Sequence, residues 1–279
     1  MKKIIFSSCI LKGEIDMSTI LGYRNLCDFH THTTYSLHGM SSPSEIVDAA
    51  IKEELEFIAI TDHYYPYDPS INPYEYKNQK ARLDCIKSYF RPLKDTIKVV
   101  SGWEYNLFAS DDYDTYDMFD SFANNAHSYY RFNLIGYHDW FAPEKVSLPN
   151  IYIELSSRIH RGCYNCISHF EQLLEVLYNN GNDNAKLGQF IGMILREVLS
   201  SNMIMEVNES SIKRNRDFAE MWIRRAKNIK VPIIVNTDSH IKYSVGKVDT
   251  SNELLTSVEY PKDLIINLDR DKIISLIWK

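Results

Sequence analysis

The sequence predicts an α/β protein in which short parallel strands alternate with helices. Seven apolar runs have the length of buried strands, and polar residues with helix-like apolar periodicity separate most of them. Histidines and acidic residues recur directly after these runs. This alternation is typical of βα units that build a parallel sheet or barrel.

The first predicted helix has the clearest local signals. Ser42 stands at the N-cap, Pro43 at the first helical position and Glu45 at the third, which indicates a capping box and a helix of about a dozen residues. The predicted strands are residues 23–29, 56–60, 97–103, 132–137, 163–168, 202–207 and 231–236. Further predicted helices are residues 73–90, 114–126, 170–179, 186–200 and 215–227, and residues 263–278 predict a short strand and a helix.

Length and composition favour one globular domain. The 279 residues include 31 Lys and Arg against 37 Asp and Glu, and this net charge of -6 disfavours a stable nucleic-acid partner. We expect a single domain over residues 21–279 after a flexible N-terminal extension, residues 1–20. No stretch is long and apolar enough to predict a membrane span, and five irregularly spaced cysteines favour a reducing, cytoplasmic location.

The unusual residues fall just beyond the predicted strands. In a parallel βα barrel the carboxyl ends of the strands meet on one face, so side chains far apart in sequence can share a pocket there. The residues at these positions are His30, His32, His38, Asp62, His63, Glu104, His138, His169, Asp238 and His240.

This pattern indicates a metal centre. His30 and His32 alternate along an extended chain, so both imidazoles can bind one ion. Seven of the nine histidines occur at such positions together with Glu104 and Asp238, and these nine ligands exceed what one ion can use. We therefore expect about two to three divalent ions, and the nitrogen and oxygen ligands favour zinc, manganese or iron.

Six segments resemble a known family. In chain order they are "DFHTHTTYSLHG", "FIAITDH", "SGWEYNL", "LIGYHDW", "ISHFE" and "NTDSH". They are similar to the motifs of the PHP (polymerase and histidinol phosphatase) family of metal-dependent phosphoesterases. The resemblance implies a distorted (βα)7 TIM-like barrel with up to three metal ions at the carboxyl ends of the strands.

The resemblance also implies a role for each ligand. It assigns the first metal to His30, His32, Glu104 and Asp238. Glu104 would bridge to a second metal held by His138 and His169, and the third would be held by His38, His63 and His240. Asp62 would orient a ligating imidazole by accepting its N–H, although a solvated loop aspartate is the alternative.

The expected activity is hydrolysis of a small phosphate monoester by attack of a metal-bridging hydroxide. Two close divalent ions lower the pKa of a bridging water to about 7 and neutralise phosphate oxygens. The predicted catalytic residues are Glu104, Asp238 and His240. The predicted phosphate-binding residues are Arg158, Arg161, Lys213, Arg214 and Arg216, with surface ion pairs as the alternative.

Several functions remain open at this level. The length and motifs are similar to the histidinol phosphatase branch, so histidinol phosphate is the first substrate to test. Other branches imply a nuclease or a nucleoside bisphosphate phosphatase. A non-catalytic metal-binding domain and hydrolysis of a C–N bond are further alternatives, disfavoured because every ligand position is occupied and because Glu104 takes the bridging position.

Overall fold

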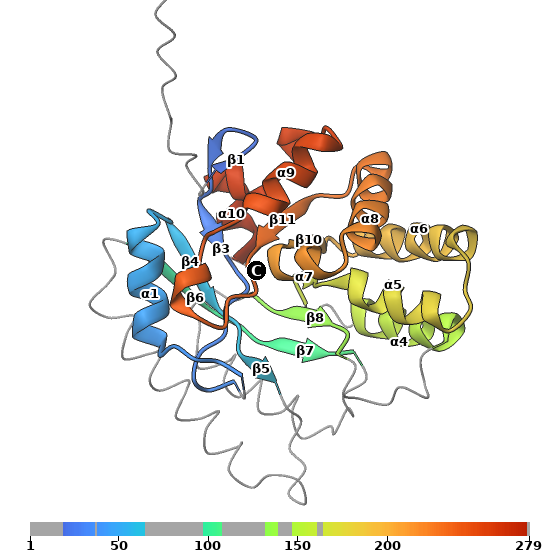
Figure 1. Cartoon of the computed structure of the whole chain (residues 1–279), viewed down its shortest axis with the longest axis horizontal. Coiled ribbons are helices and arrows are strands. Elements are labelled where there is room, and N and C mark those ends of the chain that lie inside the picture. Colours follow the sequence, from blue (N-terminus) through green and yellow to red (C-terminus); the bar gives the residue numbers. More distant parts are fainter. Residues whose placement is uncertain are drawn as a thin grey trace, which may run out of the picture.

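The computed structural model describes residues 19–36, 38–64, 97–107, 132–138, 147–160 and 164–277, and these form an α/β fold (Figure 1). The predicted helices at 73–90 and 114–126 lie outside the described residues. The helices are α1 (Pro43–Lys52), α4 (Leu148–His160), α5 (Phe170–Asn179), α6 (Asn184–Ser200), α7 (Glu209–Arg214), α8 (Arg216–Ile229), α9 (Asp249–Ser257) and α10 (Arg270–Ile277). Short 3-10 turns are η2 (Lys242–Ser244), η3 (Lys262–Leu264) and η4 (Ile266–Leu268).

The described strands form two entirely parallel sheets and one small antiparallel pair. The pair is β1 (Thr19–Ile20) and β2 (Tyr23–Arg24). The three-stranded sheet has the order β3 (Cys27–Asp28), β4 (Phe57–Ile60) and β6 (Lys98–Ser101). The six-stranded sheet has the order β11 (Ile233–Asn236), β10 (Ile204–Asn208), β9 (Cys166–Ile167), β8 (Leu134–Gly136), β7 (Glu104–Asn106) and β5 (His63–Tyr64).

Two chain segments connect the sheets. The segment that contains β4 continues into β5, and the segment that contains β6 continues into β7. These two segments pair with each other twice, as β4 with β6 in the three-stranded sheet and as β5 with β7 in the six-stranded sheet. Gly102 lies at the second of these transitions, where an added Cβ would lie 1.6 Å from the carbonyl oxygen of Phe132. The α/β class with parallel strands is therefore confirmed, whereas the described strands are paired as two sheets and not as one closed seven-stranded barrel.

Buried polar side chains hold β3 against β11. Asn236 accepts a hydrogen bond from the Phe29 N–H, and Asp28 accepts from the Thr237 N–H. Asn267 donates to the carbonyls of Cys27 and Val235 and accepts from the Val235 N–H. We call Asp28, Asn236 and Asn267 the polar seam, and all three are fully buried.

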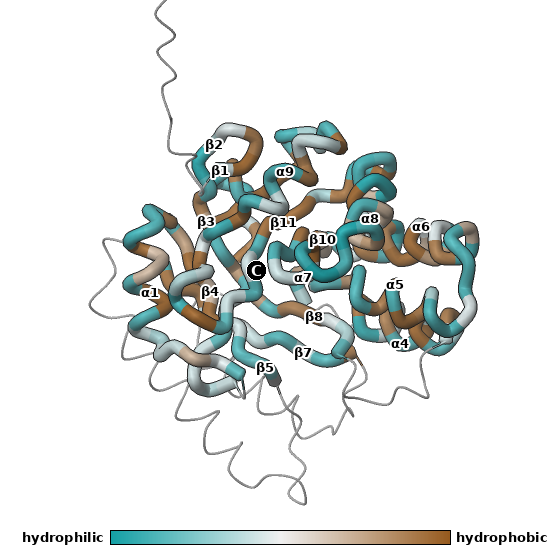
Figure 2. The backbone as a smooth tube through the Cα atoms, viewed as in Figure 1, coloured by the Kyte–Doolittle hydropathy of each residue, from teal (hydrophilic) through white to brown (hydrophobic). Residues whose placement is uncertain are grey.

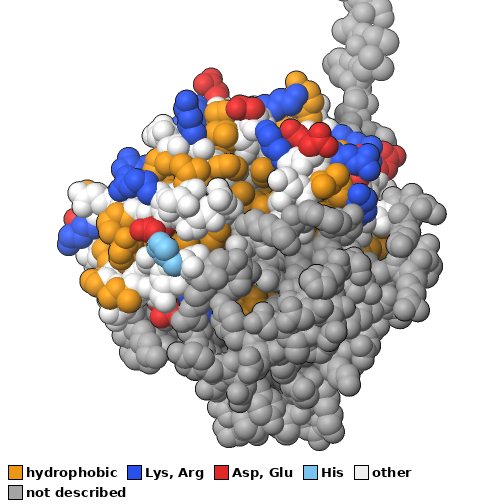
Figure 3. Space-filling view, turned by 180° about the vertical axis from the view of Figure 1, so that it is seen from behind, with side chains coloured by type: hydrophobic (Ala, Val, Ile, Leu, Met, Phe, Trp, Pro, Cys, Tyr) orange, Lys and Arg blue, Asp and Glu red, His pale blue; other side chains and the backbone are white. Residues whose placement is uncertain are grey.

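The helices cover the strands as amphipathic layers. In Figure 1, α4, α5, α6 and α8 lie together on one side of the sheet, and α1 covers β4 and β6 on another. Figure 2 shows hydrophobic segments along the central strands and hydrophilic residues on the outer parts of the helices. On the face seen in Figure 3, the basic side chains of the described surface are interspersed with acidic, apolar and uncharged ones.

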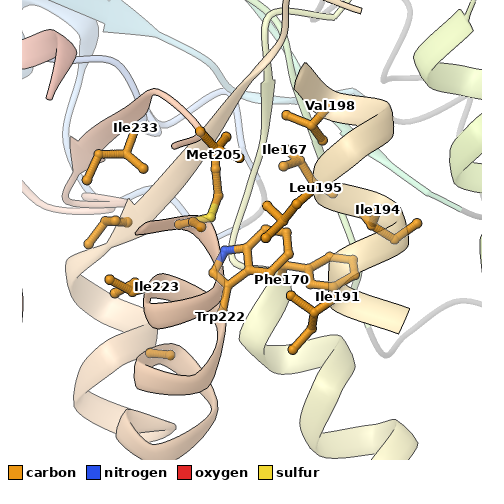
Figure 4. Close-up of a cluster of buried hydrophobic side chains, with 14 of the residues drawn as sticks. Ile167, Phe170, Ile191, Ile194, Leu195, Val198, Met205, Trp222, Ile223 and Ile233 are labelled. Atoms are coloured by element: carbon orange, nitrogen blue, oxygen red, sulfur yellow. The ribbon is translucent and has the colours of Figure 1, made fainter. Parts of the chain in front are cut away.

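The largest apolar cluster lies between the helices and the sheet. The indole of Trp222 stacks on Phe170 with ring centroids 4.4 Å apart, and Met205 and Leu195 lie beside it (Figure 4). A second cluster takes apolar residues from seven successive strand segments, namely Cys27, Ala59, Val100, Leu134, Cys166, Ile204 and Ile234. Because neighbouring strand residues point to opposite faces, these two clusters cover the two faces of β8 to β11, and a smaller cluster under α1 covers the outer face of β4 and β6.

Several predicted elements match closely. Helix α5 spans the predicted residues 170–179, and α1 has the capping box at Ser42 and Glu45. Helices α4, α7 and α9 were not predicted, although Ile151, Leu155 and Ile159 of α4 have helical spacing and are buried. The strand predicted within 263–278 is wrong: the 3-10 turn η4 occupies Ile266–Leu268, and one isolated bridge joins Ile265 to Ile233.

No helix within the described residues is long and apolar enough to cross a membrane.

Candidate metal centre

The ends of several strands bring a group of imidazoles and carboxylates together. Glu104 begins β7 and lies at the centre of this group, with its side chain fully buried. The other members with ligand atoms near Glu104 or one another are His30, His32, His63, His138, His169, Asp238 and His240. We call these eight residues the histidine–carboxylate cluster.

The first part of the cluster surrounds Oε2 of Glu104. This oxygen lies 3.3 Å from Nε2 of His30 and 3.4 Å from Nε2 of His32. Oδ1 of Asp238 lies 3.5 Å and 3.2 Å from the same two nitrogens. The four residues assigned to the first metal by their sequence are thus brought together.

The second part surrounds the other carboxylate oxygen. Oε1 of Glu104 lies 3.3 Å from Nε2 of His138 and is in close contact with Nε2 of His169. Because the two oxygens of Glu104 face different imidazole groups, this carboxylate has the geometry of a bridging ligand. Nδ1 of His63 lies 2.8 Å from Oε2 and completes a further group of ligand atoms with His138.

The third group differs from the sequence-based assignment. His63 and His240 share a group of ligand atoms with His32, and the ring of His32 stacks with each of theirs, with centroid distances of 4.3 Å and 4.2 Å. His38 is exposed and is absent from the three groups that the described residues form. The participation of His38 stays a prediction.

Buried atoms without hydrogen-bond partners test whether this cluster fits metal ions. Nε2 of His30, Nε2 of His32, Oε2 of Glu104 and Nδ1 of His169 are buried in the described structure and make no hydrogen bond. Leaving a buried polar atom unpaired costs roughly 1–3 kcal/mol, so native proteins rarely tolerate several together. A divalent cation would satisfy the first three at once, and we conclude that the residues fit.

The electrostatics of the cluster favour bound positive charge. Burial raises the pKa of Glu104, but the imidazoles of His138 and His30 outweigh this and hold it well below its usual range. Burial lowers the pKa of His30, yet Glu206 and Glu104 raise it well above the usual value. Burial, followed by the charge of His63, lowers the pKa of His32 to about 3. Glu104 therefore stays ionised and His32 neutral, as metal ligands require, whereas His30 favours a protonated ring whose Nε2 proton a bound ion would replace.

Two cluster residues have left-handed backbones. The φ angles are 28° at His169 and 55° at Asp238, a region that residues other than glycine occupy at some cost. Gly136 permits the position of His169, because an added Cβ would lie 2.5 Å from the imidazole Cε1. Strain of this kind persists where surrounding contacts determine the conformation, as they do here.

Asp62 supports the cluster through a serine. Asp62 is fully buried, which excludes a solvated loop position. It accepts hydrogen bonds from the Ser36 hydroxyl and from Thr33, and Oγ of Ser36 lies 3.2 Å from Nδ1 of His32. Asp62 is thus connected to the imidazole of His32 through Ser36, and a direct bond to an imidazole stays a prediction.

Sequence reasoning missed Glu206. This carboxylate is fully buried in β10, and its Oε1 lies 2.8 Å from Nδ1 of His30. The available signal was an acidic residue inside the apolar run "NMIMEV", since an unpaired charge is rarely buried.

Four of the five expected phosphate-binding residues lie in the described part of the chain, and their role stays a prediction. Arg158 is buried in α4 and bonds to Glu154 and Tyr164. Lys213 pairs with Glu209, while Arg214 and Arg216 are exposed. Arg161 lies outside the described residues.

The family comparison agrees with this geometry. The model of the PHP domain matches residues 28–210, well over half of the chain, so this chain belongs to the PHP domain family. A "Probable phosphatase" of Caldanaerobacter subterraneus subsp. tengcongensis is 24% identical over 281 residues, covering 94% of this chain and 92% of that protein. A "Probable phosphatase" of Clostridium acetobutylicum is 30% identical over 108 residues, and the alignment spans less than half of that relative, 43%, and 37% of this chain.

A solved structure has a similar fold. It is the histidinol phosphate phosphatase of Lactococcus lactis subsp. lactis, in complex with zinc, L-histidinol and phosphate. The TM-score is 0.58 at 19% sequence identity, and the match covers 85% of this chain and 95% of that one. At this identity the likeness shows the fold.

Proposed function

We propose that this chain is a phosphatase that hydrolyses a small phosphate monoester with the help of divalent metal ions. The observation that carries the proposal is the set of unpartnered, buried ligand atoms around Glu104, contributed by the ends of β3 and β7. The names of the two relatives and of the solved neighbour agree with a phosphoric ester hydrolase.

The cluster offers places for about two to three ions. His30, His32 and Asp238 would hold one ion with Oε2 of Glu104, and His138 and His169 would hold another with Oε1. His63 and His240 would form a third place with His32, and His38 remains a candidate there. Bound divalent ions, zinc, manganese or iron, would acidify a coordinated water and neutralise phosphate charge.

The exposure of the cluster indicates the direction from which substrate enters. The side chains of His30 and His32 are fully buried, whereas those of Asp238 and His240 are 11% and 29% exposed. Substrate would approach past His240, and Asp238 would lie between the incoming phosphate and the buried imidazoles. Glu104, whose side chain is fully buried, would act from the side of the site that faces away from solvent. The three proposed catalytic residues would thus have distinct positions.

We also propose that the strands form the distorted (βα)7 barrel of the family. Thr31 and Ser239 form a parallel bridge, the His32 N–H donates to the Ser239 carbonyl at 2.8 Å, and the polar seam continues this contact. The seven strand segments that supply the second apolar cluster would then surround it as a barrel interior. Closure of this kind would bring His30 and Asp238, at opposite ends of the strand order, into one site.

A nuclease or nucleoside bisphosphate phosphatase is the alternative within the family. The net charge of -6 and the mixed charges of the described surface in Figure 3 favour a small substrate.

The test combines metal analysis with activity. Protein purified without chelator should contain about two to three equivalents of zinc, manganese or iron. His32→Ala and Glu104→Ala should abolish hydrolysis of p-nitrophenyl phosphate, whereas His160→Ala, which changes an exposed histidine of α4, should leave it unchanged. Full turnover in both cluster variants would contradict the proposal.

Substrate class needs a separate panel. Histidinol phosphate, sugar phosphates, nucleoside 3',5'-bisphosphates and single-stranded oligonucleotides should be compared with the metal-loaded protein. Preference for an oligonucleotide would favour the nuclease alternative.

A further inference from the structure

The carboxylate of Glu206 lies beside the cluster and is hydrogen-bonded at both oxygens. Its Oε1 lies 2.8 Å from Nδ1 of His30 and accepts from Nδ2 of Asn236 at 2.9 Å. Its Oε2 accepts from the backbone N–H of His169 at 3.1 Å and from Nδ2 of Asn208 at 3.0 Å. Four donors from β3, β11, the end of β9 and β10 itself therefore converge on one side chain.

Asn236, Asn208 and the backbone of His169 offer only N–H donors to Glu206, and accepting them at both oxygens fits an ionised carboxylate. Because a carboxylate has acceptor sites on both oxygens and no proton to donate, Nδ1 of His30 must carry the proton. The lone pair of a neutral His30 ring is then on Nε2, the atom that faces Glu104 and Asp238 without a hydrogen bond. Glu206 thus presents the correct nitrogen of His30 to an ion.

The second oxygen acts on a different part of the cluster. His169 has a φ angle of 28°, and the bond from its N–H to Oε2 of Glu206 supports this left-handed backbone. The ring of His169 then reaches Oε1 of Glu104, on the opposite side of the bridging carboxylate from His30.

We propose that Glu206 is a positioning residue that couples the first and second metal places, by setting the tautomer of His30 and the backbone of His169 with one carboxylate. This inference rests on the proposed metal centre and adds to it a residue that touches neither ion. His32 differs, because a neutral hydroxyl, Ser36, supports its Nδ1.

Glu206→Gln tests the proposal with nearly unchanged volume. An amide has one acceptor oxygen, and its NH2 group must face at least one of the donors that the carboxylate accepted. If the NH2 group faces His30, the ring carries its proton on Nε2 and cannot bind the ion there. Zinc affinity, measured by competition with a chromogenic chelator, should fall about 10- to 100-fold.

Glu209→Gln is the matched control. Glu209 is also buried, and it accepts from the backbone N–H groups of Thr250 and Ser251 at the start of α9. This variant should keep the zinc affinity of the unmutated protein. Equal affinity of the Glu206→Gln variant and the unmutated protein would overturn the role of Glu206, whereas failure of the unmutated protein to bind zinc would overturn the metal centre as well.

A measurement on the unmutated protein covers the case in which Glu206→Gln does not fold. In zinc-loaded protein, nitrogen-15 NMR should detect a His30 Nδ1 proton that is hydrogen-bonded and protected from solvent exchange. A His30 ring that binds zinc through Nδ1, or an unprotected Nδ1 proton, would overturn the proposal.

Discussion

The polar seam and the inner residues of the histidine–carboxylate cluster, His30, His32 and Glu104, are all buried but differ in hydrogen bonding. In the seam, Asp28 accepts from Thr237 and Gly246, and the amide of Asn267 bonds at both its oxygen and its nitrogen. In the cluster, His30, His32 and Glu104 each leave a buried ligand atom without a hydrogen bond.

The difference separates architecture from function. Buried polar atoms are tolerated when they are paired, and the seam pairs its atoms with the chain itself. The cluster needs something that the chain does not supply, and its ionised carboxylates and neutral His32 specify a cation. We therefore expect the seam to control stability without metal and the cluster to control stability only through metal.

The largest stability effect is expected from Asn267→Ala. The change removes bonds to Cys27 and Val235 and leaves buried backbone groups unpaired, which should lower the free energy of unfolding by about 3 kcal/mol. Urea unfolding of metal-free protein measures this loss. Asn182→Ala, which removes one bond at a helix end, should cost much less. An unchanged midpoint for Asn267→Ala would contradict the role of the seam.

Metal removal should have the next largest effect, and only through the cluster. A ligand at about 100 times its Kd stabilises the folded state by roughly 2.7 kcal/mol. Zinc added to chelator-treated protein should raise the thermal midpoint accordingly, and Glu104→Ala should lose this increment. The Asn267→Ala variant should retain the zinc-induced rise in thermal midpoint. Loss of this rise in that variant would show that the seam and the cluster are not separate.

The smallest effect is expected outside both regions, at the start of α1. The Lys242 ammonium, 2.8 Å away, and the Ser42 N–H lower the pKa of Glu45 from 4.5 to about 2. Since the pKa of Glu45 is lower in the folded state, ionised Glu45 stabilises the fold fully above about pH 4.5, and this stabilisation is lost as the pH falls through about 2. Glu45→Gln should therefore be slightly less stable near neutral pH, and this difference should disappear near pH 2. A difference that grows in acid would contradict this sign.

Local signals predicted the parts of the fold that depend on neighbouring residues. The capping box at Ser42 and the apolar periodicity of residues 170–179 predicted α1 and α5. The predicted strand near Ile266 failed, since an apolar run of this length does not by itself distinguish a strand from a 3-10 turn packed on β11.

The cluster was predictable where residue type and position were enough. His30 and His32 alternate after a strand, and Glu104 and Asp238 follow others, so convergence at the strand ends predicted their meeting. The group formed by His32, His63 and His240 was not predicted, because ring stacking depends on how β5 and the segments after β3 and β11 pack.

The sequence alone determined the α/β class, the position of the histidines and acidic residues directly after the strands, and the metal-ligand character of the site. Each of these depends on residue type and on the spacing of apolar residues over short stretches. Tertiary structure decided which atoms have partners. Whether Glu206 supports His30, whether Ser36 connects Asp62 to His32, and which nitrogens are left for an ion all depend on side chains that come together from distant strands, and no local pattern encodes those distances.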